Sequence, residues 1–316
     1  MTVVVIGDAN VDLEVRLPVG SGELVLAHPE PRLFGGGSAA NTAAALARMG
    51  VPCRFVGAIG DDSFGRFALM TLEAAGVDVT SVTIADDQPT VTVIVVVPPD
   101  GERLIYVWPA TGGAHGSLEV DRALAAVVGA DWLHVSGICL RLSPAREAVL
   151  AAMDEAQSRD IPVSLDLNLR LENWGWRGGF RDVVQSAISR ADVILGGATD
   201  EVGAITDHGD PVASALALAG TDRTVVARMG ADGSVACRDG HTTVVPAFAV
   251  EVVDTVGAGD AFNAGFVCSR ISGGSLREAM RMGSAVAACT ISRAGARSHP
   301  TLTEIERMLD GGETYD

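Results

Sequence analysis

The stretch of this chain most suggestive of chemistry is DTVGAGDAFNAGF, which runs from Asp254 to Phe266. Gly257 and Gly259 allow the backbone to turn sharply and a ligand to approach it closely. The small apolar residues that follow predict a helix, whose first N–H groups lack intrahelical partners and whose dipole favours an anion. A phosphate group suits such a position. A carboxylate beside it would repel the phosphate, so we expect Asp260 to have a chemical task of its own.

A second glycine cluster, FGGGSAANTAAALARMG, runs from Phe34 to Gly50 and places three glycines before another predicted helix, with Asn41 in its first turns. Taken alone, such a turn is more often a packing feature than a binding site. A dinucleotide-binding motif needs G-x-G-x-x-G after a strand and an acidic residue farther on, and neither cluster has that spacing. The spacing of the glycines therefore excludes a dinucleotide-binding motif, but it is compatible with a phosphate-binding or sugar-binding site.

The elements that must position these turns are short apolar runs that alternate with Ala-rich segments of helical spacing, such as Asn41 to Met49 and Glu147 to Arg159. Continuous apolar strands between helices indicate a mostly parallel sheet covered on both faces. The fold class is therefore α/β. The expected strands are Thr2 to Asp8, Arg54 to Gly60, Trp132 to Gly137, Pro162 to Asn168, Val193 to Gly197 and Thr224 to Gly230.

Two regions depart from this alternation of strands and helices. Residues Asn10 to Pro18 alternate apolar and polar side chains, which predicts a strand with one wet face. The runs Thr90 to Val97 and Glu102 to Trp108 flank the turn sequence PPDG and predict a hairpin. We expect a small second sheet that forms a lid, a dimer-forming surface, or both. The expected division is a catalytic domain at 1–11, 34–85 and 111–316 and a lid at 12–33 and 86–110. A further hairpin around Arg238-Asp239-Gly240 is expected at the edge of the main sheet.

Composition narrows the classes of function. The net charge of −17 argues against nucleic acids and anionic membranes as partners, because both require a basic surface. The sequence contains no lysine, which excludes the P-loop lysine, the protein-kinase lysine and any Schiff-base lysine. Any phosphate chemistry must rely on backbone N–H groups, arginines and a metal ion. Five scattered cysteines and a first strand without a basic leader favour a reduced, cytoplasmic protein.

Three motifs together carry a family resemblance: GDANVD at the first strand, GGGSAAN near the start and DTVGAGDAFNAGF near the end. In this order, and over nearly the whole chain, they resemble the ribokinase-like (PfkB-type) carbohydrate kinases. The resemblance implies a three-layer α/β fold with a mostly parallel central sheet, a small β-sheet lid, and phosphoryl transfer from ATP with Mg²⁺.

The resemblance gives Asp260 the role of general base, which takes the proton of the acceptor hydroxyl. The N–H groups of Gly257, Ala258, Gly259 and Asp260 then form an anion hole for the charge that develops on the transferred group. This arrangement is physically consistent, since phosphoryl transfer depends mainly on positioning and electrostatic support. The structural alternative for Asp260 is a first-turn acidic residue that complements the helix dipole.

The sugar site implied by the resemblance contains Asp12, Gly36, Gly37 and Asn41. A carboxylate and an amide suit vicinal hydroxyl groups, while glycines let a substrate approach the backbone. Taken singly, Asp12 could be a solvated edge-strand residue and Asn41 a helix cap.

On the nucleotide side, ATDEVGAIT resembles the family's Asn-x-x-Glu region, which makes Glu201 the residue that holds Mg²⁺ through water. Ala198 stands where the family has asparagine, so the metal and phosphate network is expected to differ there. The stretch ARMGADGS suggests Arg228 and Gly230 as ATP contacts, and Asn168 is expected to belong to the same site. Arg228 could equally form a surface ion pair of little value.

Asp254 and the loop RAGARSHP resemble the corresponding segments of several family members, and this resemblance implies a monovalent-cation site, with K⁺ as the candidate ion. This loop is one residue shorter than the family's pattern.

The segments LHVSGICLRLSP and DLNLRLENW resemble in particular the 2-keto-3-deoxygluconate kinases, in which an arginine at the position of Arg170 binds the carboxylate of the sugar acid. Those enzymes carry Tyr-x-Arg in the lid, whereas this chain reads Tyr106-Val107-Trp108. Half of the expected carboxylate clamp is therefore absent, and a neutral sugar stacked against Trp108 is an alternative.

The sequence thus predicts an ATP-dependent kinase that phosphorylates a hydroxyl of a small sugar or sugar acid. A nucleoside kinase of the same fold is one alternative, since an apolar lid with Tyr106 and Trp108 would suit it, and a catalytically weak sugar-binding regulatory protein is another. A homodimer through the lid is also expected, because a sheet as rich in valine as Val91 to Val97 should not remain exposed.

Overall fold

The computed structural model describes residues 1–17, 31–98, 104–171, 175–176 and 178–311. Its main sheet has eight strands in the order β14-β13-β12-β11-β10-β9-β1-β4. The strands from β4 to β12 run parallel, while β13 and β14 add an antiparallel edge, as predicted for the hairpin around Asp239. Their bounds are β1 (Val3–Ile6), β4 (Cys53–Val56), β9 (Trp132–Ser136), β10 (Val163–Asp166), β11 (Val193–Gly197), β12 (Thr224–Arg228), β13 (Ser234–Arg238) and β14 (His241–Val245).

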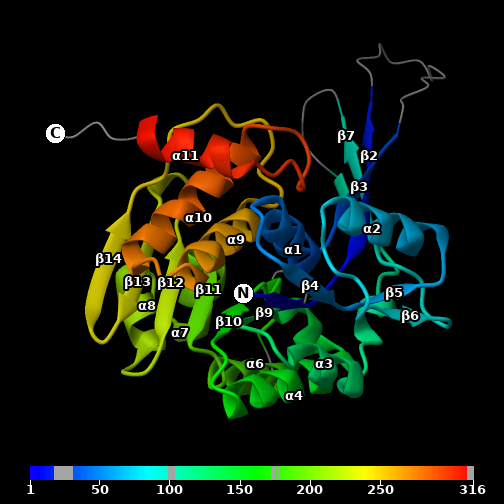
Figure 1. Cartoon of the computed structure of the whole chain (residues 1–316), viewed down its shortest axis with the longest axis horizontal. Coiled ribbons are helices and arrows are strands. Elements are labelled where there is room, and N and C mark those ends of the chain that lie inside the picture. The colour runs from blue at the N-terminus through cyan, green and yellow to red at the C-terminus, as the bar shows by residue number, and fades with distance from the viewer. Residues whose placement is uncertain (18–30, 99–103, 172–174, 177, 312–316) are drawn as a thin grey trace.

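Helices cover both faces of this sheet (Figure 1), which makes the three-layer architecture expected from the sequence. One face carries α1 (Ser38–Arg48), α9 (Ala258–Ile271), α10 (Leu276–Ile291) and α11 (Leu302–Gly311). The other carries α3 (Val120–Val127), α4 (Ala145–Ser158), α6 (Gly178–Ile188) and α8 (Pro211–Ala219). Because side chains alternate along a strand, Val3 and Val5 of β1 enter the first core, and Val4 and Ile6 enter the second.

Short helical turns lie between several of the longer elements. These are η1 (Ala114–Gly116), η2 (Gly137–Arg141), the π-helical turn η3 (Ala198–Gly203), α7 (Ala204–Thr206) and η4 (Gly230–Asp232).

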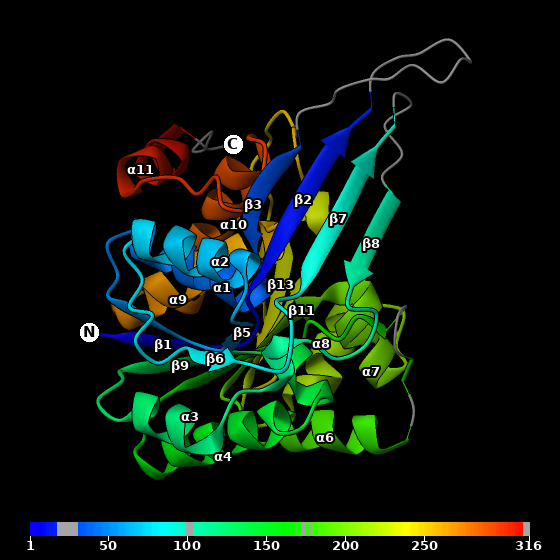
Figure 2. The same ribbon diagram turned by 90° about the vertical axis from the view of Figure 1, so that its right-hand side faces the viewer.

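A four-stranded second sheet has the order β3-β2-β7-β8 and projects from the body (Figure 2). It consists of β2 (Asn10–Arg16), β3 (Arg32–Gly36), β7 (Thr92–Val97) and β8 (Leu104–Trp108), and α2 (Ser63–Ala74) packs against it. We refer to these four strands as the lid. The predicted hairpin is confirmed as the antiparallel pair β7 and β8. The lid limits of 12–33 and 86–110 remain a proposal, since β2 begins at Asn10, β3 ends at Gly36, and residues 18–30 and 99–103 lie outside the described residues.

The expected single strand from Arg54 to Gly60 is wrong. The run splits at Gly57 into β4 in the main sheet and β5 (Ala58–Gly60), which pairs with β6 (Thr83–Ala85) in a separate sheet. A side chain at Gly57 would place its Cβ 2.4 Å from the carbonyl oxygen of Gly7. The chain therefore leaves the main sheet at a point where two backbones meet too closely for any residue but glycine.

Within the residues that the structure describes, no helix is both long enough and apolar enough to cross a membrane.

Asp62 links α2 to the lid and yields a prediction about stability. Its Oδ1 accepts a hydrogen bond of 2.7 Å from the N–H of Gly65 at the start of α2, and its Oδ2 accepts one of 2.8 Å from the N–H of Thr90, just before β7. We expect Asp62→Ala to lower the free energy of unfolding by about 1–3 kcal/mol, because it removes a helix cap and leaves a second N–H unpaired. Chemical denaturation measures the loss.

The neighbouring Asp61 provides a matched control, because it is exposed and its side chain pairs, within the part of the chain that the structure describes, only with the exposed Arg66. Asp61→Ala should change the free energy of unfolding by less than about 0.5 kcal/mol. Equal stability of the two variants would contradict the assigned role of Asp62.

Candidate active site

Polar side chains gather where the parallel strands of the main sheet end. Asp8 follows β1, Ser136 ends β9, Asp166 ends β10 and Arg228 ends β12. In open α/β sheets, ligands bind in the crevice outside the carboxyl ends of the strands. The contacts described below show that this edge also receives the N-terminal ends of α1 and α9.

Helix α9 begins at the turn singled out from the sequence. Gly257 precedes the helix with a φ of 81°, in the left-handed region that favours glycine. A Cβ at Gly257 would also lie 2.8 Å from the carbonyl oxygen of Ala296. The turn is therefore restricted to glycine by its backbone angle and by its neighbour, and it presents the first N–H groups of α9 to the crevice.

Asp260, in the first turn of α9, is held by two donors from α1. The hydroxyl of Ser38 donates a hydrogen bond of 2.5 Å to Oδ1, and Nδ2 of Asn41 donates one of 2.9 Å to Oδ2. Burial raises the pKa of Asp260 to about 7, although these two hydrogen bonds oppose the shift and the carboxylates of Asp166 and Asp8 add to it. A carboxylate with a pKa near neutrality is suited to exchange protons with a bound hydroxyl.

Asp8 fixes the start of α1, although Gly37 at the cap position offers no side chain of its own. Its two carboxylate oxygens accept hydrogen bonds of 3.0 Å from the N–H of Ser38 and 3.2 Å from the N–H of Ala39. The carboxylate after β1 therefore caps a helix that begins about thirty residues later in the chain. Sequence reasoning did not identify Asp8, although its position at the end of a buried strand was a usable signal.

Asp12, the predicted sugar ligand, lies on β2, where it pairs with Phe34 of β3, and its carboxylate lies beside Gly36. A Cβ at Gly36 would lie 2.6 Å from Oδ1 of Asp12, and one at Gly37, where φ is 98°, would lie 2.6 Å from the carbonyl oxygen of Asp8. Burial raises the pKa of Asp12 to about 6, while Arg297 and a hydrogen bond of 2.7 Å from Asn10 oppose the shift. Both glycines therefore leave room beside buried acceptors.

Arg297 connects the surroundings of Asp12 with those of Asp260. It was not identified from the sequence. Its Nε donates a hydrogen bond of 3.0 Å to Oδ1 of Asn41, and its Nη2 donates one of 2.8 Å to the carbonyl oxygen of Gly36. Its Nη1 donates a bond of 2.6 Å to the hydroxyl of Thr71 in α2. The structure thus brings Asp12, Gly36, Asn41 and Asp260 into one contiguous cluster. No sequence pattern distinguishes this arginine from those on the surface.

Arg228 is largely buried, so the alternative of a surface ion pair is wrong. Its Nη2 lies 2.9 Å from Oδ1 of Asp166 and 3.7 Å from Oε2 of Glu201, and its Nη1 donates a bond of 2.6 Å to Oδ1 of Asn263 in α9. It also donates to the carbonyl oxygen of Gly259, at 3.3 Å. One guanidinium therefore ties the ends of β10 and β12 to the turn that begins α9.

Glu201, on η3, bridges two strand ends. Its Oε1 accepts a hydrogen bond of 2.8 Å from the N–H of Leu169, and its Oε2 accepts one of 2.7 Å from the N–H of Gly197. Burial and the nearby Asp166 raise its pKa, which Arg228 opposes. Ala198, in the expected asparagine position, is buried in the core below this turn.

The remaining predicted residues are Asn168, Gly230, Arg170 and Trp108. Asn168 donates a hydrogen bond of 3.2 Å to the hydroxyl of Ser136, and Gly230 begins η4 with a φ of 60°. Arg170 is exposed, and Trp108 is 52% exposed at the end of β8. Among the described residues, neither Arg170 nor Trp108 forms a hydrogen bond with the Asp260 cluster.

Asp254 is buried and lies against the loop that the sequence associates with it. It accepts hydrogen bonds of 3.1 Å each from the N–H of Val256 at Oδ1 and from the N–H of Gly295 at Oδ2. The structure therefore brings together the two segments of the expected monovalent-cation site.

The described residues contain no group of three or more histidine, cysteine, aspartate and glutamate side chains that could hold a metal ion. Mg²⁺ commonly keeps several waters and binds through one or two carboxylates together with substrate phosphates. The carboxylates of Asp166 and Glu201 both face Arg228 at the strand ends. This donor set fits Mg²⁺ bound through water and nucleotide phosphates.

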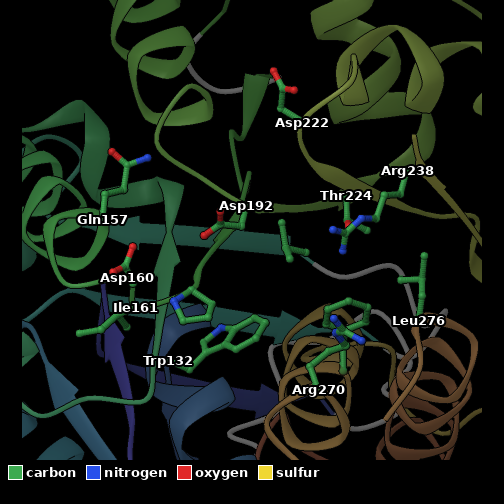
Figure 3. Close-up of a pocket in the computed structure, with 13 residues that line it drawn as sticks. Trp132, Gln157, Asp160, Ile161, Asp192, Asp222, Thr224, Arg238, Arg270 and Leu276 are labelled. Carbon is green, nitrogen blue, oxygen red and sulfur yellow. The ribbon is translucent and has the colours of Figure 1, made fainter. Parts of the chain in front are cut away.

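A cavity of about 680 Å³ lies at the other end of the strands (Figure 3). Its lining includes Trp132, Val193 and Thr224, the first residues of β9, β11 and β12, together with Arg270 near the end of α9. The charged side chains are spread around its rim (Figure 3). None of the Asp260 cluster lines it, so the cavity is separate from the candidate site.

Comparison with known proteins agrees with this geometry. A model of the pfkB family of carbohydrate kinases matches residues 1–303. The chain is 33% identical to an ATP-dependent ribose-1-phosphate kinase of Halopiger xanaduensis, over 98% of each protein. The structure of an aminoimidazole riboside kinase from Salmonella enterica, complexed with aminoimidazole riboside and an ATP analog, has a TM-score of 0.79 at 28% identity, over 98% of this chain and 99% of that one. A putative ribokinase II from E. coli, in complex with ATP and Mg²⁺, shares the fold with a TM-score of 0.85 at 22% identity, over 98% and 99% of the two chains. The ribokinase-like fold predicted from the sequence is confirmed.

The Arg228 cluster yields a prediction about stability. Arg228→Met should lower the free energy of unfolding by about 3–5 kcal/mol, because it leaves the buried carboxylate of Asp166 without its cation. Chemical denaturation measures the effect. Arg190→Met is a suitable control, since Arg190 pairs with the exposed Asp154, and it should cost no more than about 1 kcal/mol. A loss at Arg228 as small as that at Arg190 would show that the cluster does not stabilise the strand ends.

Proposed function

The chain belongs to the pfkB family of carbohydrate kinases, and we propose that it transfers the terminal phosphoryl group of ATP to a hydroxyl of a small sugar or sugar derivative, with Asp260 as the general base. The observation that carries this proposal is the position of Asp260. It lies in the first turn of α9, beside the glycine turn, and it is bonded to Asn41 of the expected sugar site.

The proposed step begins when the acceptor hydroxyl replaces one of the two protein donors on Asp260. The hydroxyl proton passes to the Asp260 carboxylate as the oxygen forms a bond to the γ-phosphorus, and the bond from that phosphorus to the departing oxygen of ADP breaks. The N–H groups of Gly257, Ala258, Gly259 and Asp260 stabilise the charge on the transferred group. A pKa of about 7 makes a large fraction of Asp260 available as the base at neutral pH.

Mg²⁺, bound with the nucleotide, would neutralise negative charge on the phosphates. We assign Glu201 to hold it through water, with Asp166 nearby, and Arg228, Gly230 and Asn168 to the surroundings of the nucleotide. A monovalent cation such as K⁺ is proposed beside Asp254 and the loop 293–300. The cation would support the turn that carries the anion hole.

For the substrate, we propose a sugar whose vicinal hydroxyls bind Asp12 and Asn41 while its carbon framework lies over Gly36 and Gly37. The exposed guanidinium of Arg170 suits a carboxylate or phosphate at the far end of the substrate, and Trp108 suits an apolar face. A nucleoside is the second candidate, favoured by the exposed Tyr106 and Trp108 of the lid. A cytoplasmic location is proposed, because all five cysteines are free and buried.

The test of this function combines a substrate panel with one substitution. We expect ATP consumption with at least one neutral sugar, sugar acid or sugar phosphate, and none with nucleosides. Asp260→Ala should lower kcat by on the order of a hundredfold or more, because it removes the general base, with little change in the KM for ATP. Asp121→Ala, at an exposed position in α3, is the matched control. Equal activity of Asp260→Ala and the parent protein would disprove the role of Asp260.

We also propose a homodimer through the lid. Strand β8 is an edge strand with five consecutive exposed side chains, including Ile105 at 62% and Tyr106 at 56% exposure. An exposed apolar edge is a template for pairing with another strand, and a second copy of the lid would cover it.

We expect the mass of a dimer in light scattering at micromolar concentration, and a monomer for Ile105→Lys, which places a charge in the proposed contact. Val244→Lys, at an exposed position on the edge strand β14 away from the lid, is the control and should remain dimeric. A monomeric parent protein would contradict the proposal.

A further inference from the structure

Arg297 occupies a junction of three parts of the molecule. It comes from the loop after α10 and bonds to α1 through Asn41, to α2 through Thr71 and to the lid through the carbonyl oxygen of Gly36. Its guanidinium packs directly on the backbone of β3, since a Cβ at Gly35 would lie 2.1 Å from Nη1. Gly35 therefore makes room for the arginine, and no larger residue could stand there without displacing it.

Arg297 is half-buried, and none of the described residues gives its charge a close counterion. Its three bonded acceptors are neutral, and among the described residues no carboxylate lies within ion-pair distance of it. Burial lowers its pKa to about 10, while Asp12, Asp260 and Asp8 oppose the shift from farther away. Burying a cation without a close counterion is costly. The acidic groups that compensate it are those of the candidate active site.

The contact with Asn41 has a directional consequence. A guanidinium can only donate hydrogen bonds, so the bond from Nε selects the oxygen of the Asn41 amide. The amide nitrogen must then point the other way, where it donates to Oδ2 of Asp260. Without Arg297, the amide could rotate and present its oxygen to the carboxylate, which would repel it.

We propose that Arg297 is a positioning residue that joins the lid to the general base. Its guanidinium holds the end of lid strand β3 and the amide that orients Asp260 at the same time. A change in the position of the lid over a bound sugar would therefore alter the orientation of Asp260 through this one side chain. This inference rests on the proposed kinase function.

The proposal predicts the pH dependence of catalysis. The charged groups that face Asp260 are Asp8 after β1, Asp166 of β10, Arg228 of β12 and Arg297. Loss of Arg297 would remove a positive charge and release the Asn41 donor, and both changes raise the pKa of Asp260. Because the base acts only when deprotonated, the acid limb of kcat/KM, expected near pH 7, should move to higher pH.

The experiment compares pH profiles of kcat/KM for the sugar. In Arg297→Met, we expect the acid limb to move up by about one pH unit and the sugar KM to rise on the order of tenfold. Arg297→Lys should not restore the parent profile, because a single ammonium group cannot bond to Asn41, Gly36 and Thr71 as the planar fork does. Arg277→Met is the matched control, since the one side-chain bond of Arg277 among the described residues goes to the carbonyl oxygen of Val244 at an exposed edge.

A double-mutant cycle separates positioning from general structural damage. If Arg297 acts through Asn41, then Arg297→Met should shift the acid limb by less in an Asn41→Ala background than in the parent, because only the effect of the lost charge remains there. An unchanged limb in Arg297→Met, full rescue by lysine, or a shift of the same size in both backgrounds would overturn the proposal. Should Arg297→Met fail to fold in a thermal melt, Arg297→Gln and Gly35→Ala test the same junction by smaller changes.

Activity measurements on the parent protein and on Asp260→Ala distinguish failure of the proposed role of Arg297 from failure of the proposed kinase function. An active parent and an inactive Asp260→Ala, combined with an unaltered Arg297→Met profile, would refute the role of Arg297 alone. A parent without kinase activity on any sugar of the panel would refute the proposed function itself.

Discussion

The structure depends on one buried contact between helices from opposite ends of the chain. The N-terminal turn of α1 supplies Ser38 and Asn41, and the N-terminal turn of α9 supplies the carboxylate that both of them bond. Two helix N-termini thus approach the same acidic group, where each dipole stabilises negative charge. Neither helix directly follows a strand of the parallel sheet, since α1 follows β3 of the lid and α9 follows the segment after β14. Side chains at the carboxyl ends of the parallel strands hold both helix starts instead: Asp8 after β1 accepts bonds from the first N–H groups of α1, and Arg228 at the end of β12 donates to Gly259 of α9.

The electrostatics of this edge explain how an acidic, lysine-free chain can handle a polyanion. Asp8, Asp166 and Asp260 lie within the same buried region, and Arg228 and Arg297 are the cations embedded among them. A guanidinium keeps its charge when buried and forms several directed bonds at once, which an ammonium group does not. Both arginines use this property to tie loops together. Burial is the main cause of the raised pKa of Asp260, and the carboxylates that add to the shift belong to the same network as the bonds that fix its orientation.

The sequence was informative where the backbone itself restricts the residue type. Gly257 requires its positive φ, the apolar runs form the strands of a sheet covered on both faces, and the two runs that flank PPDG form the antiparallel pair β7 and β8. All of these are local signals. The split at Gly57 and the role of Arg297 could not be predicted, since each is defined by a neighbour distant in the chain: Gly7 for the first, Asn41 and Gly36 for the second. Asp8 and Asp166 are intermediate cases. The sequence shows that each lies at the end of a strand, but it does not show which residues each one contacts.

Ala198 shows how the site tolerates a departure from the family pattern. The asparagine expected there would bring a side-chain amide to the turn, yet the two carboxylate oxygens of Glu201 already bind the N–H groups of Leu169 and Gly197. The turn is therefore complete without the amide, and Ala198 packs into the core instead. Its effect is confined to what the missing amide would have contacted on the nucleotide side. Among the described residues, the Asp260 cluster bonds to that turn only through Arg228, so the replacement gives no structural reason to regard the proposed base or the proposed anion hole as impaired.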